Sequence, residues 1–242
     1  MLTFVTWLWR PAQGYRSAFC AEHVNALARM IDRHYAGPHR VLCVTDIPEG
    51  IDAGVEIIPA WNDFADLPSP HGGGNRNPSC YRRLRAFHPD IGAVFGDRFV
   101  SMDLDTVITG DLTPLFNRPD PFVIWGETNP RSWYNGSLFL LTAGARPHVW
   151  TKFDPLKSPA EAFRAKRFGS DQGWISHCLG KGEATWSKAD GVYSYRVHLK
   201  PFGSKLPKNA RIVNFHGEHD PFDADMQRIP WIAQHYPMTV EA

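Results

Sequence analysis

Residues 99–108 read Phe-Val-Ser-Met-Asp-Leu-Asp-Thr-Val-Ile, an apolar run interrupted by two acidic side chains. Asp103 and Asp105 are two positions apart, so in extended backbone both would project to the same side. Adjacent carboxylates repel each other, and a bound cation is the usual reason to hold them together. Oxygen ligands favour hard divalent ions such as Mg2+ and Mn2+. The same spacing also occurs in solvated turns and caps, so this pair alone leaves both interpretations open.

The composition is that of a soluble globular protein with a sizeable core, since 43% of the 242 residues are hydrophobic and 21% are charged. A net charge of +1 argues against a nucleic-acid partner. The 4 cysteines are widely spaced without a C-x-x-C pair, which argues against a zinc site and favours a reducing, cytoplasmic compartment. No stretch approaches the ~20 apolar residues of a transmembrane segment.

Apolar runs and helical periodicities predict a mixed α/β protein that begins with a strand–helix–strand crossover. Besides the run from 99, the predicted strands are 3–8, 40–46, 55–58, 122–125, 137–141 and 210–216. The predicted helices are 18–35, 80–87, 159–167 and 172–178. The loop 59–79, rich in proline and glycine, fits either a flap over a site or a plain surface loop. Without an internal repeat or a linker, one domain is the economical prediction.

Five segments follow one another in an order that is typical of one enzyme family. They are Tyr81–Leu84, Ser101–Leu112, Tyr134–Phe139, the pair Asp171-Gln172, and Ile212–Gly217. Together they resemble motifs of the GT-A nucleotide-sugar glycosyltransferases, nearest to family 8, the glycogenin-like and galactosyltransferase-like group. In that family the corresponding segments are a basic donor-site residue, the D-x-D strand end, a Phe-Asn-x-Gly segment, an Asp-Gln pair and a C-terminal metal-ligand strand. The resemblance extends from Thr3 to about Pro221.

The resemblance implies a single GT-A (Rossmann-like) domain over residues 1–242, with a mixed central sheet flanked by helices. Residues 1–110 would form the nucleotide-binding half, ending in the D-x-D motif, and residues 111–242 the acceptor and sugar half. The implied reaction is metal-dependent, retaining transfer of a glycosyl group from a nucleoside diphosphate sugar, usually a UDP-sugar, to an acceptor hydroxyl. The acceptor would be a carbohydrate, a lipid-linked sugar or a protein. A lipid-linked acceptor would bring this cytoplasmic protein to the inner face of the membrane.

The resemblance also implies which residues hold the donor. Asp103 and Asp105 would bind Mn2+ or Mg2+, which neutralises the donor diphosphate, and Asp103 would also lie near the ribose. Arg83 would contact the donor sugar or phosphate. Thr6 and Asp46, at the ends of early strands, would lie near the nucleoside, where open α/β sheets bind their ligands.

Three further residues would line the donor-sugar and acceptor region according to the resemblance: Asn135, Asp171 and Gln172. Each has a simpler interpretation. Asn135-Gly136 is by itself a turn signal, and Asp171 would serve equally well to cap the following helix. Arg83 would likewise belong to a solvated helix face.

The C-terminal segment departs from the family pattern at two positions. The family usually has His three residues before the glycine, and here Asn214 stands there. His216 is two residues further on, so on an extended strand it faces the same side, and imidazole is the stronger ligand. We therefore predict His216 as the third metal ligand. Asp220 replaces the family's diphosphate-binding lysine, so another basic group must substitute if activity is kept, the candidates being His219, Lys200 and Lys205.

Two rival classes of function fit parts of the pattern. The segment 103–107 matches the D-x-D-x-[T/V] motif of haloacid-dehalogenase-like phosphatases, in which the first Asp is a phosphoryl nucleophile. That motif normally follows the first strand, whereas about a hundred residues precede it here. The other alternative is a GT-A-like domain that binds a nucleotide or sugar without turnover, which Asn214 and Asp220 motivate.

Overall fold

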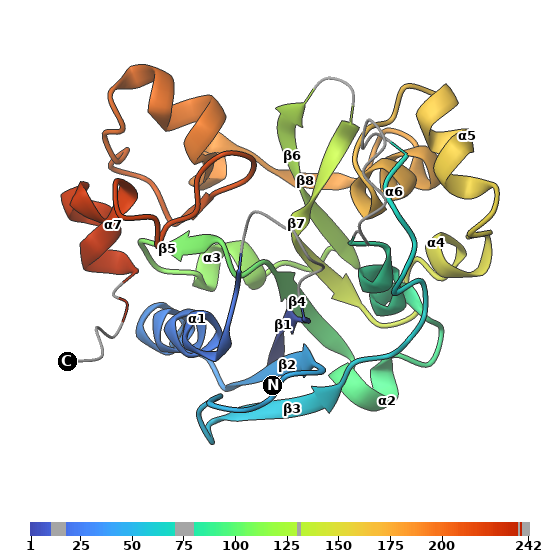
Figure 1. Cartoon of the computed structure of the whole chain (residues 1–242), viewed down its shortest axis with the longest axis horizontal. Helices are drawn as coiled ribbons and strands as arrows, with labels where there is room; N and C mark the ends of the chain where they lie inside the picture. Colours follow the sequence, from blue (N-terminus) through green and yellow to red (C-terminus); the bar gives the residue numbers. More distant parts are fainter. Residues whose placement is uncertain (11–17, 71–79, 130–131, 237, 239–242) are drawn as a thin grey trace.

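A seven-stranded mixed sheet runs through the centre of the computed structural model, which describes residues 1–10, 18–70, 80–129, 132–236 and 238 (Figure 1). Its order is β3-β2-β1-β4-β7-β6-β8, and β7 alone runs antiparallel to its neighbours. The strands are β1 (Leu2–Leu8), β2 (His39–Thr45), β3 (Val55–Pro59), β4 (Arg98–Met102), β6 (Phe122–Asn129), β7 (Ser132–Thr142) and β8 (Ala184–Trp186). The predicted fold class, a mixed central sheet flanked by helices, is confirmed.

A second sheet has three strands, in the order β5-β10-β9 among the residues described. They are β5 (Thr106–Ile108), β9 (Val192–Ser194) and β10 (Ile212–Asn214), and β10 runs antiparallel to β5 but parallel to β9. The chain leaves the large sheet at the end of β4 and enters the small one at β5. The two aspartates of the opening motif lie in the turn between these strands, so the prediction of continuous extended backbone is wrong at Leu104-Asp105.

Helices cover both faces of the large sheet. The longer ones are α1 (Ala21–His34), α5 (Ser158–Arg164), α6 (Asp171–Leu179) and the 3-10 helix Cys80–Phe87. The shorter ones are α2 (Gly92–Phe95), α3 (Thr113–Phe116), α4 (His148–Thr151) and α7 (Pro230–His235). No helix in the described part of the chain is long and apolar enough to cross a membrane.

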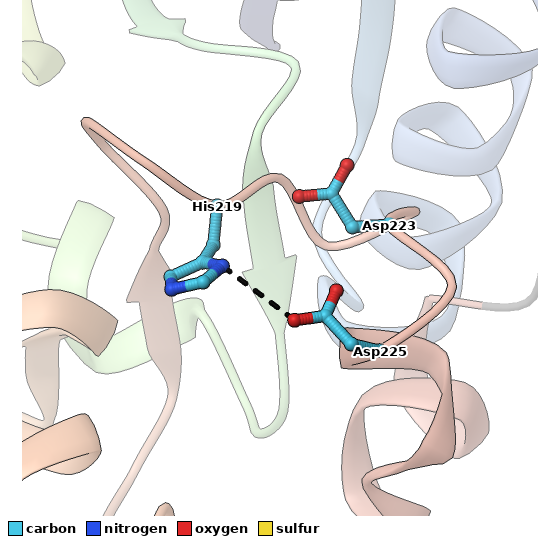
Figure 2. Close-up of side chains that lie close together, drawn as sticks. All are labelled: His219, Asp223 and Asp225. Atoms are coloured by element: carbon cyan, nitrogen blue, oxygen red, sulfur yellow. Dashed lines mark ion pairs between the residues drawn. The ribbon is translucent and has the colours of Figure 1, made fainter.

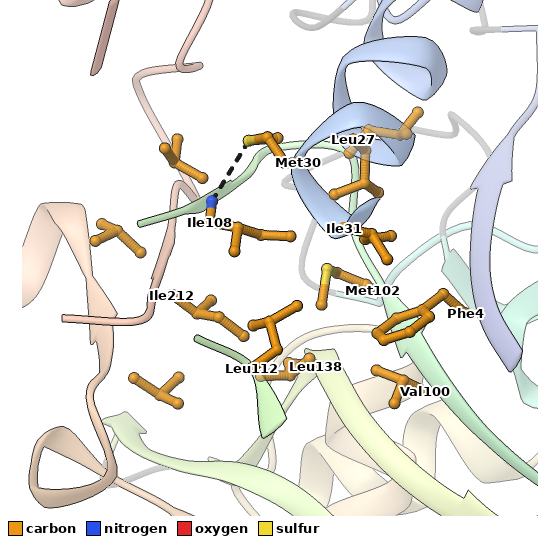
Figure 3. Close-up of a cluster of buried hydrophobic side chains, with 14 of the residues drawn as sticks. Phe4, Leu27, Met30, Ile31, Val100, Met102, Ile108, Leu112, Leu138 and Ile212 are labelled. Atoms are coloured by element: carbon orange, nitrogen blue, oxygen red, sulfur yellow. Dashed lines mark hydrogen bonds between the residues drawn. The ribbon is translucent and has the colours of Figure 1, made fainter. Parts of the chain in front are cut away.

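Successive side chains of each strand point to opposite faces of the sheet, so the core is divided between these two faces. Phe4 and Val100 point into one apolar cluster, which also contains the inner face of α1 and the small sheet (Figure 3). In this cluster the backbone N–H of Ile108 donates to the Met30 sulfur at 3.5 Å. Val5 belongs to the second cluster, against the 3-10 helix Cys80–Phe87, α4 and α6. Because both faces are covered, the carboxyl-end edge of the strands is where a ligand can enter.

The dipeptide Asn135-Gly136 lies inside β7, so its interpretation as a turn is wrong. Ile124 of β6 pairs with Phe139, but the next residue, Trp125, pairs with Asn135. This register shift makes a bulge in β7, and bulges often re-aim side chains next to active sites. Gly136 is needed here because side chains from other elements pack closely against it. The sequence did not reveal β8 and β9, because three residues are too few for a periodicity.

Candidate functional site

A cavity of about 350 Å3 opens at the carboxyl-end edge of the large sheet. Its wall is built from the end of β1, the β4–β5 turn, the first turn of α6 and the segment that follows β10. This volume lies within the range of small-molecule sites. The location agrees with the general rule that open α/β sheets bind ligands beyond the carboxyl ends of their strands.

Arg83 holds together two carboxylates of the cavity wall. Its Nε and Nη2 lie 2.8 and 2.7 Å from Oδ2 of Asp171, and its Nη1 donates to Oδ1 of Asp103. The side chains of Arg83 and Asp171 are only 7% and 3% exposed. Burial acts to lower the pKa of Arg83, but the two carboxylates outweigh it and hold the pKa well above its ordinary value. The guanidinium therefore stays charged, and a solvated helix face is the wrong description of Arg83.

Gly136 makes room for this ion pair in the bulge of β7. A Cβ at this position would lie 3.0 Å from Oδ2 of Asp171 and 3.3 Å from Nη2 of Arg83. Its neighbour Asn135 is buried, and its Oδ1 accepts a hydrogen bond from the backbone N–H of Ser137 at 2.9 Å. Ser137 lines the cavity, whereas Asn135 is not among the lining residues. Asn135 thus shapes the bulge that carries its neighbours.

Asp105 lines the same cavity, and one of its carboxylate oxygens is buried. Its Oδ1 has no hydrogen-bond partner among the described residues. Burial, followed by the nearby carboxylates of Asp103 and Asp220, raises the pKa of Asp105 well above its ordinary value. A divalent cation between Asp103 and Asp105 would satisfy the orphaned oxygen and remove the repulsion. The oxygen donors present here therefore fit Mg2+ or Mn2+.

The two candidates for a third metal ligand occupy different environments. Asn214 is fully buried in β10, where its Oδ1 accepts a hydrogen bond from Oγ1 of Thr106 at 2.8 Å. His216 lines the cavity, with its Nε2 2.7 Å from Oγ of Ser194. Burial, and then the charge of Arg196, lowers the pKa of His216 to about 4. The imidazole is therefore neutral at physiological pH, the form in which histidine binds metals.

The predicted ligands Asp103, Asp105 and His216 share one cavity, but their ligand atoms do not all approach within 4.8 Å. Arg83 holds the first of them and Ser194 the last. Within the described ranges, one group does meet that distance: His219, Asp223 and Asp225 (Figure 2). This group lies beside α7, and none of its members lines the cavity.

Gln172 lines the cavity, whereas Thr6 and Asp46 are not among its lining residues. Thr6 is buried in β1, and its hydroxyl has no hydrogen-bond partner in the part of the chain that is described. Asp46 is exposed just after β2. The helix α6 starts at Asp171 with Ser170 in the cap position, so Asp171 is the first helical residue rather than the cap.

The sequence did not single out several other residues of the wall. Trp9 follows β1 directly, and the guanidinium of Arg82 lies 4.8 Å from its ring centroid. Its position just beyond a predicted strand was the available signal. Cys80 also lines the cavity, three residues before Arg83 on the same short helix. Burial raises the pKa of the Cys80 thiol to about 12, which argues against a nucleophilic role.

Several solved structures share this architecture. The galactosyltransferase LgtC, solved with donor and acceptor sugar analogues, matches with a TM-score of 0.65 at 15% identity, over 99% of this chain and 98% of LgtC. The chain has the GT-A glycosyltransferase fold. GlyE from Streptococcus pneumoniae TIGR4 has this fold with a TM-score of 0.56 at 14% identity, over 92% of this chain and 56% of GlyE. The bifunctional glycosyltransferase WbbM matches with a TM-score of 0.55 at 15% identity, over 97% of this chain and 50% of WbbM. No protein-family model and no curated protein matches the sequence.

The predicted resemblance to GT-A glycosyltransferases is thereby confirmed for the fold. At such low sequence identity the likeness establishes the fold alone, and the chemistry depends on the side chains that line the cavity. The GT-A fold also offers no support for the phosphatase alternative. Asp103 follows β4, the fourth strand along the chain, whereas the phosphatase motif follows the first.

Proposed function

We propose that this protein is a metal-dependent glycosyltransferase, which moves a glycosyl group from a nucleoside diphosphate sugar to an acceptor hydroxyl with retention of configuration. The proposed donor is a UDP-sugar, and the proposed metal is Mn2+ or Mg2+. One observation carries the proposal: Asp103 and Asp105 line the cavity of a GT-A fold together, and Asp105 has a buried carboxylate oxygen without a hydrogen-bond partner among the described residues.

Three side chains would hold the cation, namely Asp103, Asp105 and His216. The cation would supply Lewis-acid stabilisation of the negative charge that develops on the leaving diphosphate. Arg83 forms an ion pair with Asp103, and it would contact the donor's sugar or phosphate from the same position. Thr6, Asp46 and the indole of Trp9 would lie near the nucleoside, where a base can stack on an aromatic ring.

Asp171 and Gln172 would face the transferred sugar from the first turn of α6. Glycosyl transfer passes through a state with oxocarbenium character, which a nearby carboxylate stabilises. The buried ion pair with Arg83 keeps Asp171 in place for that role or for orienting the acceptor. We assign Asn135 a positioning role, through its hydrogen bond to Ser137. The acceptor is proposed to be a carbohydrate, lipid-linked or protein hydroxyl on the cytoplasmic side.

Thermal unfolding with UDP, GDP and ADP, each with and without Mn2+, tests the donor assignment. A ligand that binds only the folded state raises its apparent stability, by about 2.7 kcal/mol at a concentration one hundred times its dissociation constant. We expect a shift that needs both UDP and Mn2+ in the wild-type protein and is absent in the Asp105→Asn variant. The same shift without metal would contradict the metal assignment.

A non-catalytic nucleotide-binding domain is the second candidate, and Asp220 favours it. This carboxylate is buried near Asp105, at the position where the family that the sequence resembles usually carries a lysine. Hydrolysis of UDP-glucose and UDP-galactose in the presence of Mn2+ distinguishes the two candidates. Slow release of UDP from either donor supports the transferase. Binding without release from any donor, also with sugar acceptors added, would support the non-catalytic domain.

A further inference from the structure

The wall of the cavity carries an excess of negative charge. Three carboxylates line it, those of Asp103, Asp105 and Asp171, and among the described lining residues Arg83 is the only lysine or arginine. Two of the three carboxylates already engage that guanidinium. A nucleoside diphosphate carries several negative charges, so a second cationic side chain would favour its binding.

Two of the three basic candidates that the sequence suggested, Lys200 and His219, are already engaged with each other. Nζ of Lys200 lies 2.7 Å from Nε2 of His219 and 3.3 Å from Oε2 of Glu218. None of the three candidates, Lys200, Lys205 and His219, is among the described residues that line the cavity. The cation that serves the diphosphate therefore has to come from elsewhere.

Arg196 lies at the rim of the cavity, beside Gly217. A Cβ at Gly217 would lie 2.7 Å from Nη1 of Arg196, and Gly217 itself lines the cavity. Arg196 thus reaches the cavity wall although it follows β9, far from the aspartates in the sequence.

The pairing of two short strands explains this position. β9 and β10 run parallel, with Ser194 opposite Asn214, so both strands end at the same edge of the small sheet. The chain then places residue 196 two positions beyond one strand and His216 two positions beyond the other. The hydrogen bond between Ser194 and His216 holds the two strand ends together.

Unlike Arg83, Arg196 has a guanidinium group that is available to bind a ligand. It is exposed, and it forms no hydrogen bond or ion pair with any residue in the described ranges. Gly217 has a φ of +101°, which favours glycine, and the lack of a side chain lets Nη1 of Arg196 lie directly against this residue of the cavity wall.

We propose that Arg196 binds the diphosphate of the donor nucleotide, its guanidinium donating across Gly217 to the non-bridging phosphate oxygens. Arginine suits this task because its planar fork of N–H groups matches two phosphate oxygens at once. The residue replaces the cation that Asp220 cannot supply. This inference rests on the proposed function, and it assigns the diphosphate to a residue that the sequence motifs did not include.

The test compares Arg196→Ala with the wild-type protein in the presence of Mn2+. Calorimetry gives the affinities for UDP, GDP and ADP, and a ligand-observed NMR titration gives those for uridine, guanosine and adenosine. For the nucleotide that binds wild type best, we expect Arg196→Ala to weaken the diphosphate about 10- to 100-fold and the nucleoside less than about twofold. The diphosphate affinity of Arg196→Lys should lie between those of the wild-type protein and Arg196→Ala, since lysine keeps the charge but lacks the planar fork of N–H groups.

Lys208→Ala is the matched control, because it removes an exposed cation from the same segment. It should leave both affinities unchanged. Equal weakening of nucleoside and diphosphate by Arg196→Ala, or no weakening of either, would overturn the inference while leaving the proposed function intact. Failure of the wild-type protein to bind any of the three diphosphates would overturn the proposed function and this inference together.

Discussion

Arg83 and Asp171, which are 88 positions apart in the sequence, form a buried ion pair in which two guanidinium nitrogens meet one carboxylate oxygen. The pair joins the 3-10 helix Cys80–Phe87 to the first turn of α6. Gly136 of β7 lies against it, and Asp103 accepts from the remaining Nη1. The donor half and the sugar half of the proposed site are therefore held together by one guanidinium.

Removing that guanidinium should destabilise the protein strongly. In Arg83→Met the carboxylate of Asp171 stays buried without its partner, so the free energy of unfolding should fall by about 3–5 kcal/mol. Urea denaturation measures the loss. Arg82→Met is the control, because this half-buried neighbour forms no ion pair with any residue that the structure describes and packs over Trp9; we expect it to cost about 1 kcal/mol. Similar losses in the two variants would show that the buried pair contributes little.

Replacing Asp105 should have the opposite effect on the metal-free protein. The carboxylate is desolvated and repelled by Asp103 and Asp220, so Asp105→Asn should raise the free energy of unfolding at neutral pH by about 1 kcal/mol. The same variant should lose the stabilisation that Mn2+ and UDP give to the wild-type protein. Denaturation with and without Mn2+ checks both effects, and a variant that is less stable than wild type without metal would contradict the repulsion argument.

A methyl group at residue 136 should disturb the site directly. In Gly136→Ala the new Cβ would lie 3.0 Å from Oδ2 of Asp171, so we expect a loss of about 1–3 kcal/mol of stability and reduced turnover of the donor. Gly54→Ala is the matched control, since no heavy atom lies within 4 Å of a Cβ there. Denaturation and donor hydrolysis of both variants check this. Wild-type activity in Gly136→Ala would mean that the ion pair can shift freely.

The buried ring of His23 should make stability depend on pH. It is 4% exposed and packs on Phe222, with ring centroids 4.2 Å apart. Burial lowers its pKa from 6.5, against smaller opposing effects of the Cys20 backbone, Asp220 and Glu22. Below about pH 6.5 the unfolded chain takes up the proton first, so the free energy of unfolding falls as the pH drops. The slope is at most about 1.4 kcal/mol per pH unit.

The His23→Gln variant isolates this contribution from those of the other histidines. Its stability, measured by urea denaturation from pH 8 to pH 5, should fall less steeply than that of the wild-type protein below pH 6.5. Above pH 7 the difference between the two proteins should be constant. Parallel curves over the whole range would show that His23 titrates alike in the folded and unfolded chains.

Local patterns in the sequence were sufficient for the main architecture. The mostly apolar run 3–8 and the helical spacing of Val24, Leu27 and Met30 predict a buried strand followed by a helix, and the structure has both. Hydrophobic periodicity determines these elements because burial of their apolar side chains is what stabilises them. The acidic motif was recognisable as a candidate from the chemistry of its side chains, whereas the Asp-Gln pair and His216 were candidates through the family resemblance.

Contacts between distant segments decided the rest. Arg83 is an ion-pair partner rather than a surface charge because the chain brings Asp103 and Asp171 to it. Asn135-Gly136 lies in a strand because β6 pairs with it, which overrides its local preference for a turn. Arg196 reaches Gly217 only because β9 and β10 lie side by side. The sequence by itself determined which side chains are able to bind a metal, a phosphate or a sugar. The tertiary structure decided which of them lie together, because desolvation and charge pairing depend on neighbours that are remote along the chain.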